Sequence, residues 1–308
     1  MKTNYKYLFG PVPSRRLGRS LGIDVTPFKT CSLDCIFCQC GCTTYHITER
    51  SEFVPFEDVC TELEQWLAQD GCADYITFAG SGEPTLYSRL GELIAFIKEK
   101  TEIPVIVLSN GTLFHRSDVC KETALADIVK VSLSAWNEPS FQKINRPASG
   151  LSFADLLAGE RNFRNCFNGQ LWLEVFLMEG INSKPEQVQQ IAELAREIEP
   201  DTIHLNTAVR PPAETGVMPV SEKVLCSFCP LFTPPAEIIA SFGTVSSANE
   251  KEVHAETLAA LIHRHPATAT QLAAISGSDE EGIRAALAPL VEQNQLQIEV
   301  RNGEDWYK

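Results

Sequence analysis

The sequence predicts an α/β fold, a partial (β/α)6 barrel of the TIM type followed by a small C-terminal winged-helix domain. Short β-prone runs alternate with amphipathic helical stretches through most of the chain, an order typical of βα units around a parallel sheet. Residues 251–308 change to helical stretches followed by two short strands. We therefore expect a barrel domain at 1–242, a linker rich in Ser, Thr and Asn at 243–250, and a winged-helix-like domain at 251–308.

Six runs are predicted as strands because they are rich in β-branched and apolar residues. They are Leu21–Val25, Tyr75–Ala79, Val105–Ser109, Ile128–Leu133, Leu171–Leu177 and Thr202–Asn206. Helical periodicity lies between them, as in Val59–Ala68 and Leu90–Ile97. Residues 207–308 supply no obvious further units of this kind, so a partial barrel is expected in place of a full eight-stranded one.

The C-terminal segment predicts three helices and a two-stranded wing. The helices are expected at His254–His263, Thr268–Ile275 and Asp279–Gln293, and the strands at Leu296–Val300 and Asp305–Tyr307, with a turn at Asn302-Gly303. The third helix begins with three acidic residues, and residues 250–308 hold ten acidic against five basic side chains. This charge disfavours binding to DNA, so we expect a module that contacts a protein or peptide partner or that packs against the rest of the chain.

Composition excludes several classes of protein. The chain has 308 residues and a formal net charge of -14, which disfavours extended binding to nucleic acid. No apolar run is long enough to span a membrane, and the start MKTNYKYLFG lacks the apolar core of a signal peptide, so a cytoplasmic protein is expected. Its eleven cysteines then indicate metal ligands or buried thiols in place of disulfides.

Three cysteines are the most informative residues of the chain. Cys31, Cys35 and Cys38 lie on one short segment, with Phe37 just before the third. Three thiolates at this spacing are typical of a four-iron cluster that keeps one iron open to a small molecule. A zinc site or buried structural cysteines are the alternatives, although zinc sites usually use two distant Cys-x-x-Cys pairs.

Polar residues follow the predicted strands that come after these cysteines. A glycine-rich turn, Gly80, Ser81, Gly82 and Glu83, follows the second strand, where glycine lets the backbone approach a ligand closely. Ser109 and Asn110 end the third strand, and Ser132 lies in the fourth. Because such strand ends meet at one face of a barrel, we expect these residues to share a site with the cysteines, although each is also an ordinary turn residue.

Other residues are candidate contacts to a substrate. They are Arg15, Arg16 and Arg19 before the cysteines, Asn145 and Arg146 after the fourth strand, and Asn206 and Arg210 after the sixth. Arginine suits a carboxylate or phosphate, but a solvated basic turn or an ordinary helix end explains several of them equally well. Glu174 lies among apolar neighbours and needs a partner or a ligand, and His204 is interpreted as structural.

The run TCSLDCIFC at Thr30–Cys38 resembles the signature of the radical S-adenosylmethionine superfamily. FAGSGEPTL resembles its GGE-type motif, with Ser81 as a departure, and VSLSA resembles its Ser-Leu-Asp-Ala run, with Ser134 in place of the acid. The runs GPVPSRRLGRSLGID, INRP and NTAVRPPAE are similar to one branch, the group around tRNA 4-demethylwyosine synthase and its uncharacterised bacterial relatives.

This resemblance implies a [4Fe-4S] cluster bound by Cys31, Cys35 and Cys38 and, at its open iron, the amino and carboxylate groups of S-adenosylmethionine. Reductive cleavage gives a 5'-deoxyadenosyl radical that abstracts hydrogen from a substrate, with the electron from an external flavodoxin- or ferredoxin-type donor. Phe37 is expected near the adenine. Residues of the strand ends are expected to hold the cosubstrate: Gly80, Ser81, Gly82, Glu83, Ser109, Asn110 and Ser132.

Cys40, Cys42, Cys226 and Cys229 are candidates for an auxiliary cluster, or are simply small apolar residues. Cys60, Cys72, Cys120 and Cys166 are scattered singly and are expected in the core.

The substrate is expected to be a small molecule or a modified nucleoside. Radical modification of a protein or peptide, including activation of a glycyl-radical enzyme, is the alternative. A DNA-binding iron–sulfur redox sensor is disfavoured by the acidic third helix.

Overall fold

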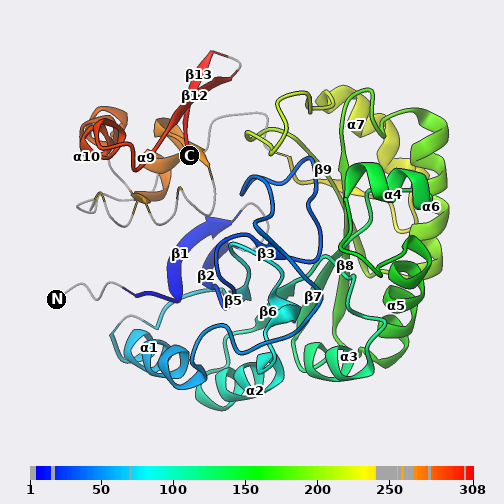
Figure 1. Cartoon of the computed structure of the whole chain (residues 1–308), viewed down its shortest axis with the longest axis horizontal. Coiled ribbons are helices and arrows are strands. Elements are labelled where there is room, and N and C mark those ends of the chain that lie inside the picture. The colour runs from blue at the N-terminus through cyan, green and yellow to red at the C-terminus, as the bar shows by residue number, and fades with distance from the viewer. Residues whose placement is uncertain are drawn as a thin grey trace.

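A computed structural model describes residues 5–14, 18–69, 71–240, 255, 258–259, 262, 266–276, 279–301 and 303–308. Its main sheet has eight strands in the order β1-β2-β5-β6-β7-β8-β9-β10 (Figure 1). All neighbouring pairs are parallel except β1 and β2, which are antiparallel. The predicted α/β fold with a mostly parallel sheet is confirmed.

Strands β2, β5, β6, β7, β8 and β9 match the six predicted runs to within a few residues. Their bounds are β1 Leu8–Ser14, β2 Gly18–Ile23, β5 Tyr75–Phe78, β6 Val105–Leu108, β7 Ile128–Ser132, β8 Gln170–Leu177, β9 Thr202–Thr207 and β10 Glu237–Ile238. In β8, Leu171, Leu173 and Val175 are fully buried against the helices, whereas Trp172 and Glu174 alternate with them on the other face. The sheet therefore has an apolar outer face and a more polar inner face along this strand.

Helices lie on the outer side of the curved sheet (Figure 1). Their bounds are α1 Phe56–Gln69, α2 Leu90–Lys100, α3 Ser117–Thr123, α4 Glu138–Ile144, α5 Phe153–Cys166, α6 Pro185–Ile198 and α7 Glu222–Phe228. Short 3-10 turns occur at η1 Pro84–Leu86 and η2 Cys229–Leu231. One large apolar core joins these helices to the sheet. Because the strands from β2 to β10 pair in parallel, their carboxyl ends lie along one edge of the sheet.

Two strands of the sheet were not predicted. β1 contains Gly10 and two prolines, Pro11 and Pro13, and therefore reads as a turn in the sequence. It lies at the edge of the sheet and pairs only with β2, a position where proline is tolerated. β10 has two residues and pairs with β9 at the opposite edge. Within the described ranges the sheet is open, because β1 and β10 do not pair.

The C-terminal elements form a second, separate core. They are β11 Ala267–Thr268, α9 Ala269–Ser276, α10 Glu280–Glu292, β12 Ile298–Arg301 and β13 Glu304–Tyr307. The strands pair in the order β11-β13-β12 and cover an apolar cluster that includes Leu272, Ile283 and Leu287. The predicted linker, Asn302 and most of the predicted helix at His254–His263 lie outside the described residues. The two later helices and the wing strands are present, and the winged-helix class stays a prediction.

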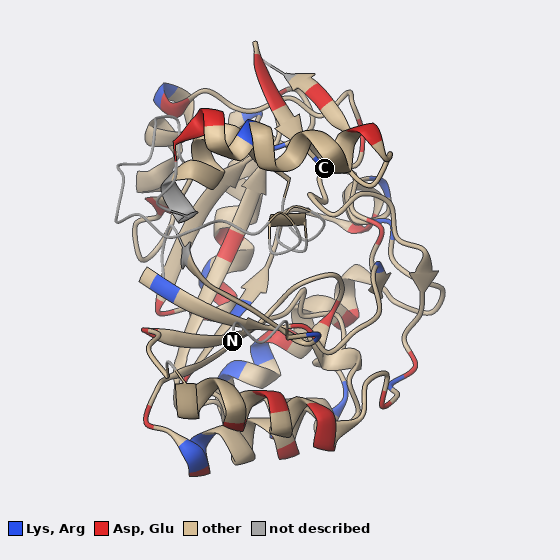
Figure 2. Ribbon diagram, turned by 90° about the vertical axis from the view of Figure 1, so that its left-hand side faces the viewer, with Lys and Arg blue, Asp and Glu red and all other residues tan. Residues whose placement is uncertain are grey.

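Acidic residues mark both ends of α10, with one basic residue between them (Figure 2). Its first turn carries Glu280 and Glu281, and its last residue is Glu292, against the single cation Arg284. This charge agrees with the expectation that α10 does not bind DNA. No helix in the described part of the chain is both long and apolar enough to cross a bilayer.

Candidate functional site

The segment Thr30–Cys38, here called the cysteine loop, is held in place by hydrogen bonds to the last residue of α4 and to the residue that follows it. It begins in the short strand β3 (Thr30–Cys31), which pairs with β4 (Tyr45–His46). The backbone N–H of Ile36 donates to the carbonyl of Ile144 at 3.0 Å, and that of Asp34 donates to the carbonyl of Asn145 at 3.0 Å. The loop is therefore braced by the Ile-Asn-Arg-Pro run.

Each of the three cysteine sulfurs is close to a polar donor from a different part of the chain. Asn110 Nδ2 lies 3.5 Å from Cys31 Sγ, and Asn145 Nδ2 lies 3.3 Å from Cys35 Sγ. Lys29 Nζ lies 3.1 Å from Cys38 Sγ. Donors of this kind stabilise thiolate sulfur and tune the potential of an iron–sulfur cluster.

The pKa values of the three thiols shift in different directions. Burial raises the pKa of Cys31 to about 12 and raises the pKa of Cys35 as well. A hydrogen bond from the Cys40 thiol, helped by the Lys29 ammonium, lowers the pKa of Cys38 to about 5. Bound iron supplies the positive charge that keeps buried thiols deprotonated, so the donor set fits an iron–sulfur cluster.

The same cysteines do not form a site for a single ion. Within the ranges given above, no three His, Cys, Asp or Glu side chains are grouped closely enough to hold one metal ion. In a four-iron cluster each thiolate binds a different iron, so the sulfurs need not converge on one point. The positions of the three sulfurs are therefore compatible with a cluster.

The residues Gly80–Glu83, here called the glycine turn, pack directly against the cysteine loop. The backbone N–H of Glu83 donates to the carbonyl of Thr30 at 3.0 Å. A Cβ atom on Gly82 would overlap that carbonyl oxygen and lie 2.7 Å from Oγ1 of Thr26. The close approach therefore requires glycine at position 82.

Asp24, at the end of β2, anchors the first half of the glycine turn. Its carboxylate accepts hydrogen bonds from the Ser81 hydroxyl at 2.6 Å and the Ser81 backbone N–H at 3.1 Å. Gly80 has a φ of +141° and lies so close to this carboxylate that a side chain would overlap it. Asp24 and the glycine turn thus form one buried unit.

Glu83 joins the ends of β5 and β6. Its buried carboxylate accepts from the hydroxyls of Thr85 at 2.6 Å and Ser109 at 2.8 Å, and from the backbone N–H of Asn110 at 2.7 Å. Burial raises the pKa of Glu83, while these hydrogen bonds act in the opposite direction. Glu83 therefore positions both predicted cosubstrate segments relative to each other.

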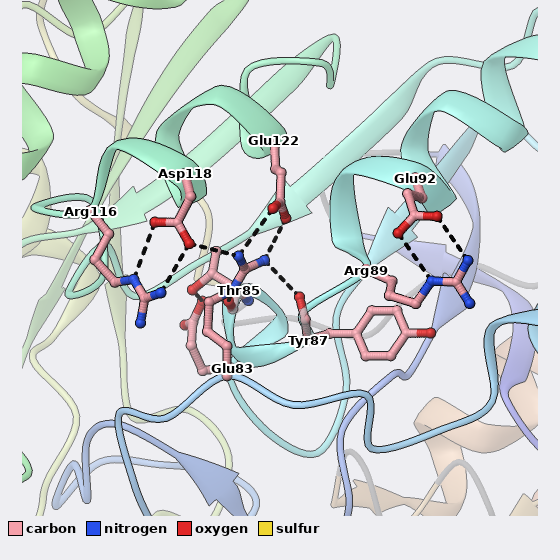
Figure 3. Close-up of polar contacts among 9 residues, drawn as sticks. Glu83, Thr85, Tyr87, Arg89, Glu92, Arg116, Asp118 and Glu122 are labelled. Atoms are coloured by element: carbon pink, nitrogen blue, oxygen red, sulfur yellow. Dashed lines mark hydrogen bonds and ion pairs between the residues drawn. The ribbon is translucent and has the colours of Figure 1, made fainter.

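Arg50 contacts the segment that directly follows the glycine turn. Its guanidinium donates to the carbonyls of Thr85 at 2.9 Å and Tyr87 at 2.8 Å, and pairs with Asp118 and Glu122. Figure 3 shows the carboxylates of Asp118 and Glu122 in contact with one guanidinium group, which also contacts the Tyr87 carbonyl. The Arg50 side chain is only 7% exposed, so its contacts are shielded from water.

We expect the Arg50→Met variant to lose about 3 kcal/mol of unfolding free energy, because a buried cation with four partners is removed. Arg89→Met is the matched control: Arg89 pairs with Glu92 in the same region, but its side chain is 26% exposed (Figure 3). Urea unfolding of the two variants measures the difference. Equal midpoints would contradict the positioning role of Arg50.

A polar group lies on the inner face of the sheet beyond Ser132. Lys130 Nζ donates to the Ser132 hydroxyl at 3.2 Å and pairs with the Glu174 carboxylate at 3.3 Å. Asn206 Nδ2 donates to Glu174 at 2.9 Å. The partner that Glu174 was expected to need is therefore Lys130, together with Asn206.

Other predicted site residues lie around the cysteine loop. The Phe37 ring stacks on Phe176, with centroids 4.4 Å apart, and Arg210 Nη1 lies 3.4 Å from Gln39 Oε1. Arg146 pairs with Glu214, and Asn145 contacts Cys35. These positions are next to the predicted cluster ligands, and their contacts to a substrate or to adenine stay predictions.

Of the three arginines predicted to contact a substrate before the cysteines, the structure describes Arg19. Arg15 and Arg16 lie outside the described residues. Arg19 is near the start of β2, where its backbone donates to Asp74 at 2.7 Å and its guanidinium lies 3.4 Å from Cys72 Sγ. The cysteine loop follows the other end of β2, so this location does not suit the expected contact beside a cluster. Arg19 lies at this end because β2 runs parallel to β5, with Ser20 opposite Tyr75.

Asp24, Lys29, Arg50 and Lys130 are among the residues in these contacts that were not singled out from the sequence. Asp24 directly follows β2, a signal that was available in the sequence, whereas Lys130 lies in the middle of β7. Lys29 and Arg50 lie on irregular segments, where only the folded chain shows their partners.

The remaining cysteines are dispersed. Cys40 Sγ lies 3.7 Å from the Gly80 carbonyl oxygen, and Cys42 is exposed. Cys226 is on α7 and Cys229 begins η2. Of those expected in the core, Cys60 and Cys120 are buried, whereas Cys72 and Cys166 are exposed, so the core prediction is wrong for that pair.

Comparisons with known proteins agree with this geometry. The family model described as Radical SAM superfamily matches residues 25–198. UPF0026 protein MJ1312 of Methanocaldococcus jannaschii is 35% identical over 226 residues, which are 73% of this chain and 70% of that protein. A Brachyspira hyodysenteriae protein named GTPase Obg is 35% identical over 305 residues, 98% of this chain, but this chain spans only 45% of that protein.

A solved structure shares the fold. The structure of TYW1 with a lysine-pyruvate adduct bound has a TM-score of 0.55 at 18% identity, covering 76% of this chain and 77% of that chain. At this identity the similarity shows the architecture alone.

Proposed function

Because this chain belongs to the radical S-adenosylmethionine superfamily, whose members use a [4Fe-4S] cluster and S-adenosylmethionine, we propose that Cys31, Cys35 and Cys38 hold its cluster. The observation that carries this assignment is the set of donors on the three sulfurs, from Asn110, Asn145 and Lys29. The glycine turn, which binds the cosubstrate in this proposal, packs against the same loop through Glu83 and Thr30.

A bound cluster would supply the single electron for cleavage of S-adenosylmethionine to methionine and a 5'-deoxyadenosyl radical, and this radical would abstract hydrogen from the substrate. The protein orients the reactants. Glu83 fixes the glycine turn relative to Ser109 and Asn110, and Asp24 fixes Ser81. Phe37 and Phe176 form an apolar stack beside the loop, which helps to exclude water that would quench a radical.

The test uses the full chain, reconstituted anaerobically with iron and sulfide and reduced with dithionite. We expect release of 5'-deoxyadenosine and methionine from S-adenosylmethionine, measured by liquid chromatography. A flavodoxin or ferredoxin is the proposed physiological donor and should replace dithionite. A protein that binds four irons but releases no 5'-deoxyadenosine with either reductant would contradict the proposal.

The inner face of the sheet is the proposed place of the substrate, a small molecule or a modified nucleoside. Lys130, Glu174 and Asn206 provide a cation, a carboxylate and an amide on three adjacent strands. The solved structure of TYW1 has a lysine-pyruvate adduct bound. In this chain Lys130 is paired with Glu174, so we propose that Lys130 acts as a bound cation and not as a nucleophile. A GTPase activity is not proposed, because the P-loop requires a Gly-Lys pair and the sequence contains none.

Modification of a protein or peptide is the second candidate. Its support is the C-terminal unit at 251–308, which has its own core and its own sheet. We propose that this unit is a winged-helix domain that binds a polypeptide partner. Retention of RNA and not of a peptide or large protein by the immobilised full chain would contradict this candidate.

Iron content tests the auxiliary cluster. If Cys40, Cys42, Cys226 and Cys229 hold a second [4Fe-4S] cluster, the reconstituted protein should contain about eight irons per chain. A value of about four would contradict the second cluster. A Cys226→Ala variant, which keeps the three loop cysteines, should then match the wild type in iron and sulfide content.

A further inference from the structure

Lys29 directly precedes the cysteine loop and is buried, with only 3% of its surface exposed. Its ammonium lies 3.1 Å from Cys38 Sγ. No carboxylate among the residues that the structure describes pairs with this ammonium. The Lys130 ammonium, by comparison, pairs with Glu174 at 3.3 Å. Since a buried cation needs a negative partner, the partner of Lys29 has to come from the cysteines and from what they bind.

The backbone at Lys29 does not explain why a lysine occupies this position. Its φ is +59°, in the left-handed region that favours glycine and costs energy for a residue with a Cβ atom. The backbone N–H donates to the carbonyl of Ser81 at 2.9 Å, and the carbonyl accepts from the N–H groups of Thr44 at 3.0 Å and Tyr45 at 2.9 Å. These bonds hold the conformation without help from the side chain. The role of the residue therefore lies in the ammonium that it brings to Cys38.

The charge of the proposed site changes during the reaction. Three thiolates give an oxidised cluster a net negative charge, and the electron that is received before cleavage of S-adenosylmethionine increases it. The buried Asp24 carboxylate, which accepts from the Ser81 hydroxyl at 2.6 Å, adds negative charge on the neighbouring glycine turn. A fixed positive charge stabilises the more negative of two forms, most strongly where water is excluded. The Lys29 ammonium is such a charge, next to Cys38.

We propose that the buried Lys29 ammonium makes the cluster easier to reduce, an inference that rests on the proposed function. Held against Cys38 Sγ, it stabilises the reduced cluster more than the oxidised one and so raises the reduction potential. The step is the transfer of one electron from the external donor. No covalent bond forms or breaks in it, and Lys29 keeps all of its protons. Lys29 acts through Cys38 and has no contact with the substrate in this role.

The experiment is a redox titration of the reconstituted proteins, followed by the electron paramagnetic resonance signal of the reduced cluster. In Lys29→Met the equilibrium constant for reduction should fall about tenfold, which lowers the potential by about 59 mV for one electron. Lys29→Arg keeps the charge and should stay near the wild type. Lys98→Met is the matched control, because it removes a cation that pairs with Asp127 on the surface. Equal potentials in all four proteins, or equally low ones in Lys29→Met and Lys29→Arg, would overturn the proposal.

The wild type alone decides the matter if Lys29→Met takes up no cluster. With ¹⁵N placed only in lysine, pulsed electron paramagnetic resonance of the reduced protein should detect coupling to the Lys29 Nζ atom, and Lys29→Arg should lack it. A wild type without this coupling would overturn the role of Lys29. Such a result would leave the proposed function intact, which fails only if the wild type forms no cluster or cleaves no S-adenosylmethionine.

Discussion

A Cys35→Ala variant is expected to release no measurable 5'-deoxyadenosine under dithionite, a loss of about a thousandfold or more relative to the wild type. In the proposed site each of three thiolates binds one iron, so the loss of one leaves the cluster without a stable attachment. Cys35 is also the sulfur that Asn145 contacts, at 3.3 Å. Iron content and product release from the anaerobically reconstituted variant measure the effect.

The control for this variant is Cys166→Ala, because Cys166 is an exposed cysteine at the end of α5. It should keep the iron content and the rate of the wild type. If Cys35→Ala still bound four irons and cleaved S-adenosylmethionine, the assignment of the cluster to the cysteine loop would be refuted.

Gly82→Ala is expected to damage both stability and binding of the cosubstrate. The added methyl group would overlap the Thr30 carbonyl and crowd Thr26 Oγ1 at 2.7 Å. Thr30 directly precedes Cys31, so the glycine turn and the cysteine loop must move apart. Overpacking of this kind costs about 1–3 kcal/mol of unfolding free energy, and we expect affinity for S-adenosylmethionine to fall about tenfold.

Gly216→Ala provides the comparison, since a Cβ at Gly216 would meet no atom within 4 Å. Urea unfolding of the iron-free proteins reports stability, and equilibrium dialysis of the reconstituted proteins reports affinity. If the two variants bound S-adenosylmethionine equally well, the close packing of the turn would not matter for the cosubstrate.

The fold could be predicted from local patterns because strands and helices are specified over short stretches. The six long parallel strands appear within a few residues of their predicted positions. β1 could not be predicted in the same way, because its glycine and prolines indicate a turn and only its edge position makes them acceptable. Arg19 lies at the start of β2, at the end away from the cysteine loop, which is why its expected contact has no support in the structure.

The residues of the candidate site also fall into two groups, those that a local sequence motif predicts and those that only the folded chain brings together. The spacing of Cys31, Cys35 and Cys38 and the glycine turn are local signals, and they were sufficient to indicate the superfamily. Their supporting residues are distant in the sequence and carry no motif. Arg50 is a clear case, because its carbonyl partners are 35 and 37 residues away and its use depends on the packing of η1 beside α3.

By itself, the sequence determined that this chain carries three cysteines and a glycine turn of one superfamily on an α/β fold, because motif spacing and strand periodicity are short-range properties. Only the tertiary structure decided what surrounds those cysteines. Asn110 reaches Cys31 across 79 residues and Asn145 reaches Cys35 across 110, and Cys40 meets Gly80 across 40. Such contacts depend on how parallel strands align their ends, which no local pattern specifies.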